Sequence, residues 1–426
     1  MKGRLCLHGV GIKHQRQLLD LVKQVVPSCK LKYRIEEKYL ADNDMYKYRS
    51  AKFQLKDKLG FKLTCNYGAL IVKDKIHPIA DVIFTYDQQR QGQVVFDLAQ
   101  RLLASKLHFL LEEPDLELRI DQLRGKFRPE ESVAFDASSP ATVLSCYVPC
   151  QIYGLSAAWY KLLQVRGEKS ILRQVRVKLR RLRSLLKLVE PLVGPKASQA
   201  CHGFLKEQAN LLSSAREYDV MLQICARLKL QPEEAPSTSH LEQVLTKLRN
   251  SQVKKLLHRC SLNQFTGRLL YIAWELQQLR LQEPYASQGL EEFLGQRLSK
   301  WQQKLVKLLQ ASQGERNMER LHRLRIKIKR FRYGIQGVQG FEGRGSLRRG
   351  LKNMQDLLGL LHDEYINTGL LTALAKAHPE DQQLQYQVAM FCGWEQARAA
   401  AALDSLDQSM EELTEQLDLW RQDYLV

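Results

Sequence analysis

Two stretches of this 426-residue chain carry rows of basic side chains at helical spacing. The rows consist of Arg176, Arg180, Arg183 and Lys187 in the first stretch and of Arg325, Lys329 and Arg332 in the second. Intervals of three and four residues place side chains on one face of an α-helix. Guanidinium and ammonium groups in a row can hold several oxygens of an anion, and each guanidinium can bind a phosphate group through two N–H donors. Both rows are therefore candidate sites for a phosphate-bearing anion.

The two rows belong to one repeated design. Residues 173–189 align without gaps on residues 322–338 at an offset of 149. The alignment places Arg176, Arg180 and Arg183 on Arg325, Lys329 and Arg332, and the apolar residues Val175, Leu179, Leu182 and Leu186 on Leu324, Ile328, Phe331 and Ile335. At about 100° per residue, the apolar positions form one stripe, and the basic row lies roughly 70–130° from its centre. The cations therefore border the buried face of each helix. If the copies pack about a two-fold-like axis, the rows face each other across one basic groove.

No acid inside either helix offsets this charge. Residues 169–189 contain eight Lys and Arg, residues 320–336 contain seven, and neither range contains Asp or Glu. Like charges four positions apart destabilise a helix by a few tenths of a kcal/mol per pair. A solvated face, or pairing with acids of other helices, is the alternative for one such helix. Two matched copies favour an external anion.

The next helices are repeated as well, because residues 201–220 match residues 347–366 at an offset of 146. The match places Lys206 on Lys352 and Arg216 on His362. Arg348 and Lys352 share one flank of their helix, and we expect them to be secondary anion contacts. Four acids lie near these positions: Glu217, Asp219, Asp363 and Glu364. We expect these acids to orient neighbouring arginines through ion pairs and not to act as catalytic carboxylates.

Composition limits the class of protein. The formal charge of +19 favours nucleic acid, a membrane surface or polyphosphate as a partner without choosing among them. The first residues lack the apolar segment of a secretion signal, and no run approaches the roughly eighteen apolar residues of a membrane span. Nine cysteines without framework spacing indicate reduced thiols and a cytoplasmic protein. Cys146 and Cys150 have no further ligands nearby, so we expect no metal site and no cofactor.

Two domains are expected. Residues 1–140 read as a smaller α/β domain, with helices at 13–26 and 92–106, β-rich runs at 61–65, 69–73 and 80–86, a turn at 8–11 and a linker at 126–143. Residues 152–426 read as helical, with breaks at 191–195, 231–240 and 337–346 and one long helix over 383–420. Four-helix bundles are the usual way to bury such helices.

Four segments in order, 176–188, 211–222, 321–333 and 351–365, resemble the CHAD family, the conserved histidine α-helical domain. The resemblance covers residues 152–420. It implies two pseudo-symmetric four-helix bundles, here residues 152–285 and 286–426, with a basic surface that binds inorganic polyphosphate and an association with polyphosphate granules. With their flanking positions, the candidate polyphosphate contacts are Arg173, Arg176, Arg180, Arg181, Arg183, Lys187, Lys206, His322, Arg325, Lys329, Arg330, Arg332, Arg348 and Lys352.

The sequence departs from the family pattern at one histidine. His322 holds the place of the family's histidine in the second copy, whereas Arg173 holds it in the first. Arginine keeps the positive charge but removes a titratable ring, so a mechanism that needs two such histidines does not fit. For His322, a neutral structural role and a direct phosphate contact both stay open.

Two other functions remain as alternatives. Nucleic acid would be attracted by the same charge, although aromatic residues for base stacking are few in the basic rows. Residues 34–40, RIEEKYL, faintly resemble the E-x-E-x-K strand of triphosphate tunnel enzymes, but Arg34 replaces the first glutamate. We therefore interpret Glu36, Glu37 and Lys38 as ordinary strand residues and expect a protein that is not an enzyme. Residues 1–140 have no function that the sequence indicates.

Overall fold

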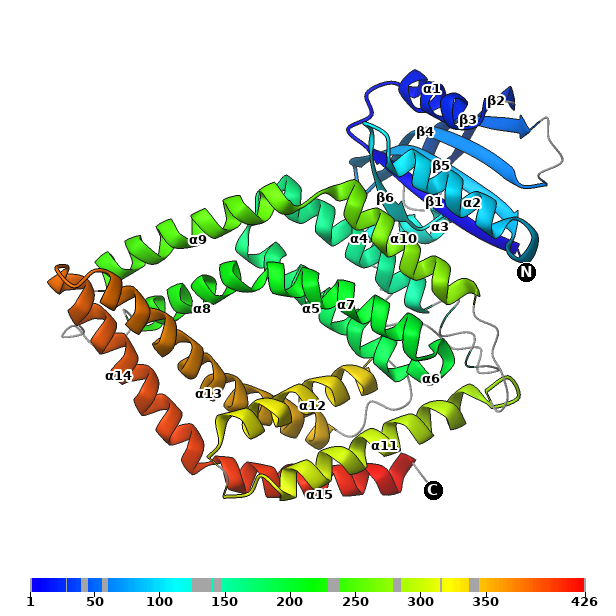
Figure 1. Ribbon diagram of the computed structural model, residues 1–426. Coiled ribbons are helices and arrows are strands. Elements are labelled where there is room, and N and C mark those ends of the chain that lie inside the picture. Colours follow the sequence, from blue (N-terminus) through cyan, green and yellow to red (C-terminus); the bar gives the residue numbers. More distant parts are fainter. Residues whose placement is uncertain are drawn as a thin grey trace.

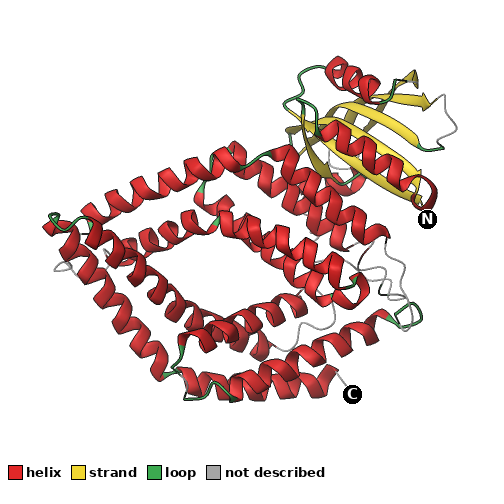
Figure 2. Ribbon diagram, in the orientation of Figure 1, coloured by secondary structure: helices red, strands yellow, loops and turns green. Residues whose placement is uncertain are grey.

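The computed structural model describes residues 2–27, 29–39, 45–55, 60–124, 140, 144, 147–228, 238–278, 285–314, 316–336 and 345–424. Within these residues, a small α/β domain precedes a large helical region (Figures 1 and 2). The predicted fold class, mainly helical with a smaller α/β domain in front, is confirmed. The expected linker at 126–143 lies outside the described residues, apart from residue 140.

The N-terminal domain is a six-stranded antiparallel sheet in the order β2-β3-β4-β5-β1-β6. Its strands are β1 (Lys2–Val10), β2 (Cys29–Tyr39), β3 (Met45–Leu55), β4 (Lys62–Val72), β5 (Lys75–Asp87) and β6 (His108–Glu112). Its helices are α1 (Gln15–Val25), α2 (Gln88–Leu103) and α3 (Leu116–Arg124). Helix α1 falls within the predicted range 13–26, whereas α2 begins four residues before the predicted range 92–106 and ends three residues before its end.

Two local predictions in this domain are wrong. The runs 61–65 and 69–73 are not separate, because β4 continues through Asn66 and Gly68, paired along its length with β3 and β5. A side chain at Gly68 would collide with the β3 backbone, so this glycine permits close strand pairing instead of a turn. Residues 8–10 also belong to a strand, since β1 pairs with β5 and β6 on its two sides, and only Gly11 has a turn conformation, with φ of 71°.

The helical region consists of two halves. The first contains α4 (Val148–Gln164), α5 (Lys169–Leu188), α6 (Glu190–Val193), α7 (Pro195–Leu211), α8 (Ser213–Leu228), α9 (Ser239–Arg259) and α10 (Leu262–Gln278). The second contains α11 (Leu290–Gln310), α12 (Met318–Gln336), α13 (Gly345–Ala377), α14 (Gln382–Asp404) and α15 (Leu406–Tyr424). Helices α4, α5, α7 and α10 form one bundle, and α11, α12, α15 and the first part of α13 form the other.

The two halves meet at two places, at opposite ends of the helical region (Figure 1). Helices α5 and α12 contact each other on one side. On the other side, the hairpins α8–α9 and α13–α14 share a separate apolar cluster that includes Met221, Leu241, Leu371 and Phe391. The halves therefore form a closed frame with apolar contacts at both ends.

The single helix expected over 383–420 is two helices. α14 ends at Asp404 and α15 begins at Leu406, with a change of direction at Ser405 (Figure 1). The Ser405 hydroxyl donates to the carbonyl of Ala402 at 3.2 Å. This break lets α14 pack on α13 in the hairpin while α15 packs on α11 in the bundle, which one straight helix could not do.

The breaks expected in the helical half fall between helices. α6 occupies the break at 191–195, because α5 ends at Leu188 and α7 begins at Pro195. Most of the other two breaks, 231–237 and 337–344, lie outside the described residues. Among the described helices, none has an apolar stretch long enough to cross a membrane.

The helical region also covers one edge of the sheet. Asn263 accepts from the β6 amide of Phe109 at 2.9 Å, and Thr266 donates to the Phe109 carbonyl at 2.8 Å. Ser156 of α4 accepts from the Leu111 amide at 3.0 Å. One hydrophobic core runs through both domains. The two domains are therefore joined by packing as well as by the chain.

We predict that Thr266→Val destabilises the protein by about 1–3 kcal/mol, because it leaves the buried Phe109 carbonyl without its donor while keeping the side-chain shape. Urea unfolding measures this loss. Gln264→Ala, at an exposed position of the same helix, is the matched control and should change little. Equal stability of Thr266→Val and the wild-type protein would mean that the α10–β6 bonds do not hold the domains together.

Candidate anion-binding site

A cavity of about 1590 Å³ lies between the two halves of the helical region. Its lining contains twelve Lys and Arg side chains: Arg173, Arg176, Arg180, Arg181, Arg216, Arg227, Arg325, Lys329, Arg332, Arg348, Lys352 and Arg398. Four carboxylates share this lining, namely Glu217, Asp356, Asp363 and Glu395. If each acid is paired with one cation, eight formal positive charges remain in the lining.

The structure brings most of the predicted contacts together. Nine of the fourteen line the cavity: Arg173, Arg176, Arg180, Arg181, Arg325, Lys329, Arg332, Arg348 and Lys352. The other five do not: Arg183, Lys187, Lys206, His322 and Arg330. The two basic rows thus face one space over part of their length only, and Arg183 and Lys187 lie outside its lining.

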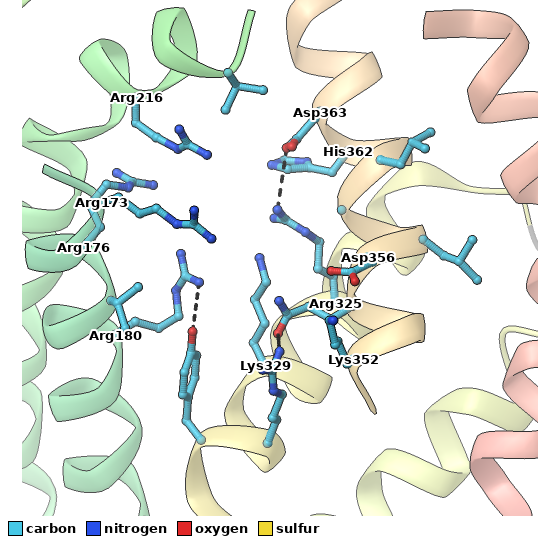
Figure 3. A pocket seen from close by; sticks show the side chains of 18 of the residues that line it. Arg173, Arg176, Arg180, Arg216, Arg325, Lys329, Lys352, Asp356, His362 and Asp363 are labelled. Atoms are coloured by element: carbon cyan, nitrogen blue, oxygen red, sulfur yellow. Dashed lines mark hydrogen bonds and ion pairs between the residues drawn. The ribbon is translucent and has the colours of Figure 1, made fainter. Parts of the chain in front are cut away.

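The cations of the two helices point toward one another. Figure 3 shows Arg176 and Arg180 extending from one half toward Arg325 and Lys329 of the other. Because these helices carry apolar residues on the adjoining face, with Leu179 and Ile328 fully buried, packing of that face fixes the direction of the basic row. The tertiary fold therefore converts two matched sequences into two facing rows.

Several of the arginines are held by neutral acceptors. Arg176 donates to the Ala209 carbonyl at 3.1 Å and to the Ser213 hydroxyl at 3.0 Å. Arg180 donates to the Tyr333 hydroxyl at 3.3 Å, across the two halves. Such bonds fix the direction of a guanidinium without cancelling its charge. The arginines are therefore oriented and still able to bind an anion.

The acids play the expected orienting role in part. Asp363 lies 3.7 Å from Arg325, as predicted, and burial raises the pKa of this carboxyl. Asp219 instead pairs at 2.7 Å with Arg249, which is outside the cavity lining and ties α8 to α9. Glu364 accepts from the Thr368 hydroxyl at 3.2 Å. Of these three acids, Asp363 is the one that pairs with an arginine of the cavity. The charge of Arg176 acts on the fourth predicted acid, Glu217.

Burial and neighbouring positive charges lower the pKa values of cations in the cavity. Burial, with the charges of Arg325 and Arg180, lowers the pKa of Lys329 to about 6. Burial and the neighbouring Arg180 lower the pKa of Arg176 to about 10. An amine with a pKa of about 6 is mostly neutral at pH 7. The cavity without an anion therefore carries less than its full formal charge near pH 7, and an anion that restores the charge of Lys329 would take up a proton as it binds.

The sequence did not predict that two histidines lie together at one side of the cavity. The rings of His322 and His362 lie 4.8 Å apart between centroids, and burial with nearby Arg325 lowers the pKa of His362 to about 4. In the repeat, the corresponding residues are Arg173 and Arg216, whose charges also act on each other. The alignment of Arg216 with His362 was the feature of the sequence that could have indicated this pair. One half therefore offers two arginines where the other offers two neutral histidines.

The N-terminal motif does not build a comparable site in the described residues. Glu36 accepts from the Tyr48 hydroxyl at 2.5 Å and lies 3.8 Å from Arg34, so its carboxylate is engaged within the sheet. The side chains of Glu37 and Lys38 lie outside the described residues, as does Cys146. No group of three or more His, Cys, Asp and Glu side chains in the described parts of the chain is arranged to hold a metal ion.

A family model and the solved structure of a plant domain agree with this architecture. The model of the CHAD domain family matches residues 155–372. The crystal structure of the CHAD domain from the plant Ricinus communis is similar, with 21% identity, a TM-score of 0.54, and coverage of 67% of this chain and 96% of that chain. PptA from Streptomyces chartreusis aligns with 15% identity and a TM-score of 0.49, covering 64% of this chain and 100% of that chain. The search of curated proteins found no match.

We predict that Lys329→Met stabilises the anion-free protein by on the order of 1–4 kcal/mol near pH 7, since it removes a partly buried amine crowded by arginines. The pKa of Lys329 falls from about 10.5 to about 6 on folding. The unfolded chain therefore binds the extra proton between these values, and this contribution makes wild-type stability rise with pH across that window.

Urea unfolding over a pH series tests this expectation. The gain from Lys329→Met should shrink as pH approaches 10.5. Lys247→Met, at an exposed position of α9, should leave stability nearly unchanged. A destabilised Lys329→Met protein at pH 7 would show that the cavity does not disfavour the lysine charge.

Proposed function

We propose, from the premise that this chain belongs to the CHAD domain family, that it binds inorganic polyphosphate in the cavity between its two helical halves. The observation that carries the proposal is the convergence of twelve basic side chains from both halves on one space with four acids. A linear chain with one charge per phosphate could bridge facing rows of cations. Fixed guanidinium groups favour such a ligand because they bind phosphate oxygens in pairs and stay protonated.

The residues that line the cavity favour a polyanion without nucleobases over a nucleic acid. Among the described lining residues, the aromatic side chains other than His362 are Tyr147 and Tyr333, and the Tyr333 hydroxyl is engaged by Arg180. Proteins that hold single-stranded nucleic acid use successive aromatic side chains on which bases stack. The backbone charge of a nucleic acid would still attract it weakly, so competition should rank polyphosphate above nucleic acid.

The proposal is one of binding without hydrolysis. The lining acids nearest the facing rows are engaged or partly buried: Asp363 pairs with Arg325, and burial raises the pKa of Glu217 beside Arg176.

We propose further that polyphosphate binding recruits the protein to polyphosphate granules, with the N-terminal domain carried along by its packing against α10. Localisation of the full chain in cells with and without polyphosphate checks this part.

We predict that the triple variant Arg180→Gln, Lys329→Gln and Arg332→Gln loses most of its polyphosphate affinity. Each neutralised phosphate contributes about 0.7–0.9 to the slope of log affinity against log salt, by analogy with nucleic acid, so the slope should fall by about 2–3. Titrations at several salt concentrations measure both quantities.

The matched control is Lys161→Gln, Lys247→Gln and Lys376→Gln, which removes the same formal charge at exposed positions outside the cavity lining. It should keep nearly full affinity and slope. Equal losses in the two triple variants would mean that net charge, and not the cavity, drives binding.

Polyphosphate affinity should fall as pH rises from 6 to 8. Lys329 has a pKa of about 6 without an anion, and a bound polyanion stabilises its charged form, so binding takes up a proton in this range. Affinity should fall by up to about tenfold per pH unit. Lys329→Arg stays charged and should flatten the profile. A long chain is the right ligand, because its interior phosphates keep their charge here. A flat wild-type profile would contradict the assignment of Lys329.

A further inference from the structure

The Lys329 side chain ends in an amine that no acceptor in the described part of the chain engages. Lys329 lines the cavity and is half-buried. Its amine forms no hydrogen bond or ion pair with a described residue, although several charges act on it. Lysines are seldom buried without a partner, because water is lost from the charged group. Lys329 is neither paired nor fully solvated, which leaves its amine available to a ligand.

The groups around this amine belong to three helices. The charged and titratable ones are Arg176 and Arg180 of α5, His322 and Arg325 of α12, and His362 and Asp363 of α13. Figure 3 shows the Lys329 side chain extending into the space between Arg180 and Arg325. The one carboxylate of this group, Asp363, lies 3.7 Å from Arg325. The amine is therefore surrounded mainly by guanidinium groups.

This environment keeps the amine unprotonated at neutral pH. With a pKa of about 6, Lys329 is roughly nine-tenths neutral at pH 7, whereas an ordinary lysine with a pKa of about 10.4 is neutral in fewer than about one molecule in a thousand. Only the neutral amine has a lone pair with which to attack an electrophile. Lys329 is therefore a nucleophile at a pH at which exposed lysines are almost entirely protonated.

Two buried donors in the cavity lining indicate where an oxyanion would bind. Nε of Arg325 and Nη1 of Arg216 have no hydrogen-bond partner among the described residues. A buried donor without a partner is costly, and natural structures seldom keep one without a use. Arg325 precedes Lys329 by four residues on α12, a rise of about 6 Å. A phosphate group bound by Arg325 would therefore lie within reach of the Lys329 amine.

A neutral amine beside a bound phosphate selects one class of reagent. In a small acyl phosphate, an electrophilic acyl carbon is joined to the phosphate through one bridging oxygen. Attack on that carbon expels phosphate, whose negative charge grows as the bond breaks. Guanidinium groups that are already oriented stabilise such a developing charge, and they hold the acyl carbon near the nucleophile. The cavity, of about 1590 Å³, has room for a reagent of this size.

We propose that Lys329 is a site of acylation by small acyl phosphates such as acetyl phosphate, with Arg180 and Arg325 holding the phosphate group of the reagent. The lone pair of the Lys329 amine attacks the acyl carbon and forms a C–N bond. The C–O bond to the phosphate breaks, its electron pair leaves with the phosphate, and the phosphate takes the amine proton. The products are Nζ-acetyllysine and hydrogen phosphate, so atoms and charge balance without another reactant.

Acylation would hold Lys329 permanently in its neutral form. An amide nitrogen does not take up a proton near pH 7, so an anion that enters the cavity could not restore the charge. The reaction itself needs one phosphate group and no polymer. Its effect on polyphosphate, however, rests on the proposed function: the acetylated protein should bind polyphosphate about as weakly as Lys329→Gln.

Mass spectrometry of the full-length protein after treatment with acetyl phosphate tests the proposal, once bound anions have been removed at high salt. At pH 7, Lys329 should be acetylated about tenfold or more faster than Lys352, which is exposed in the same cavity, and Lys247, which is exposed on α9. The rate at Lys329 should level off above pH 7, because its pKa is about 6. The rate at Lys247 should keep rising to pH 9.

The N-hydroxysuccinimide ester of acetic acid, which contains no phosphate, is the matched reagent. The preference for Lys329 over Lys352 should be about tenfold smaller with this ester, and only the acetyl phosphate rate should saturate with concentration. Arg180→Gln should raise the half-saturating concentration several-fold. Arg227→Gln, at an exposed lining position outside the group around Lys329, should change it less.

The outcomes separate this proposal from the proposed function. Acetylation of Lys329 no faster than that of Lys352, or an equal preference for Lys329 with both reagents, overturns the acylation site even if polyphosphate binds. Preferential, saturable acetylation of Lys329 in a protein that does not bind polyphosphate supports the acylation site and overturns the proposed function.

Discussion

Repulsion among partly buried cations is the constraint on which the helical region depends. Arg176, Arg180, Arg325 and Lys329 are held in one cavity with too few acids to balance them, and the pKa of Lys329 near 6 reports the cost. Apolar packing elsewhere must offset this cost. It does so at both ends of the frame, in the bundle core and in the separate cluster where the hairpins meet. The molecule is therefore stable around a site whose cations repel one another.

The pseudo-symmetry of the frame is incomplete, and the departures bear on function. α13 runs unbroken through the region that corresponds to two helices in the first half, α7 and α8, which are separated at Leu212. Arg173 and Arg216 stand opposite the pair His322 and His362. Arginine holds its charge at all working pH values, whereas these histidines are neutral near pH 7 because burial disfavours their charged form. Arg173 and Arg216 of one half thus keep their charge in the cavity lining, whereas His362 of the other half is neutral there.

The N-terminal domain packs directly against the helical region. Side chains of α4 and α10 bind the outer backbone groups of β6, which would otherwise form an open edge. The domain also contains its own buried network, in which Asp81 lies 2.6 Å from Arg119 and 2.7 Å from His8. Asp81 is fully engaged by these two partners, which ties α3 to the sheet and gives this network a structural explanation.

The repeated helices, their buried stripes and the basic rows beside them could be predicted from the sequence, because i, i+3 and i, i+4 spacing is a property of each helix alone. The sequence could not determine that Arg332 enters the cavity while its counterpart Arg183 does not, since that depends on how α5 and α12 approach each other. The strand through Gly68 and the break at Ser405 were likewise decided by partners distant in sequence. Local periodicity fixes which face of a helix is basic, but only tertiary packing decides what that face meets.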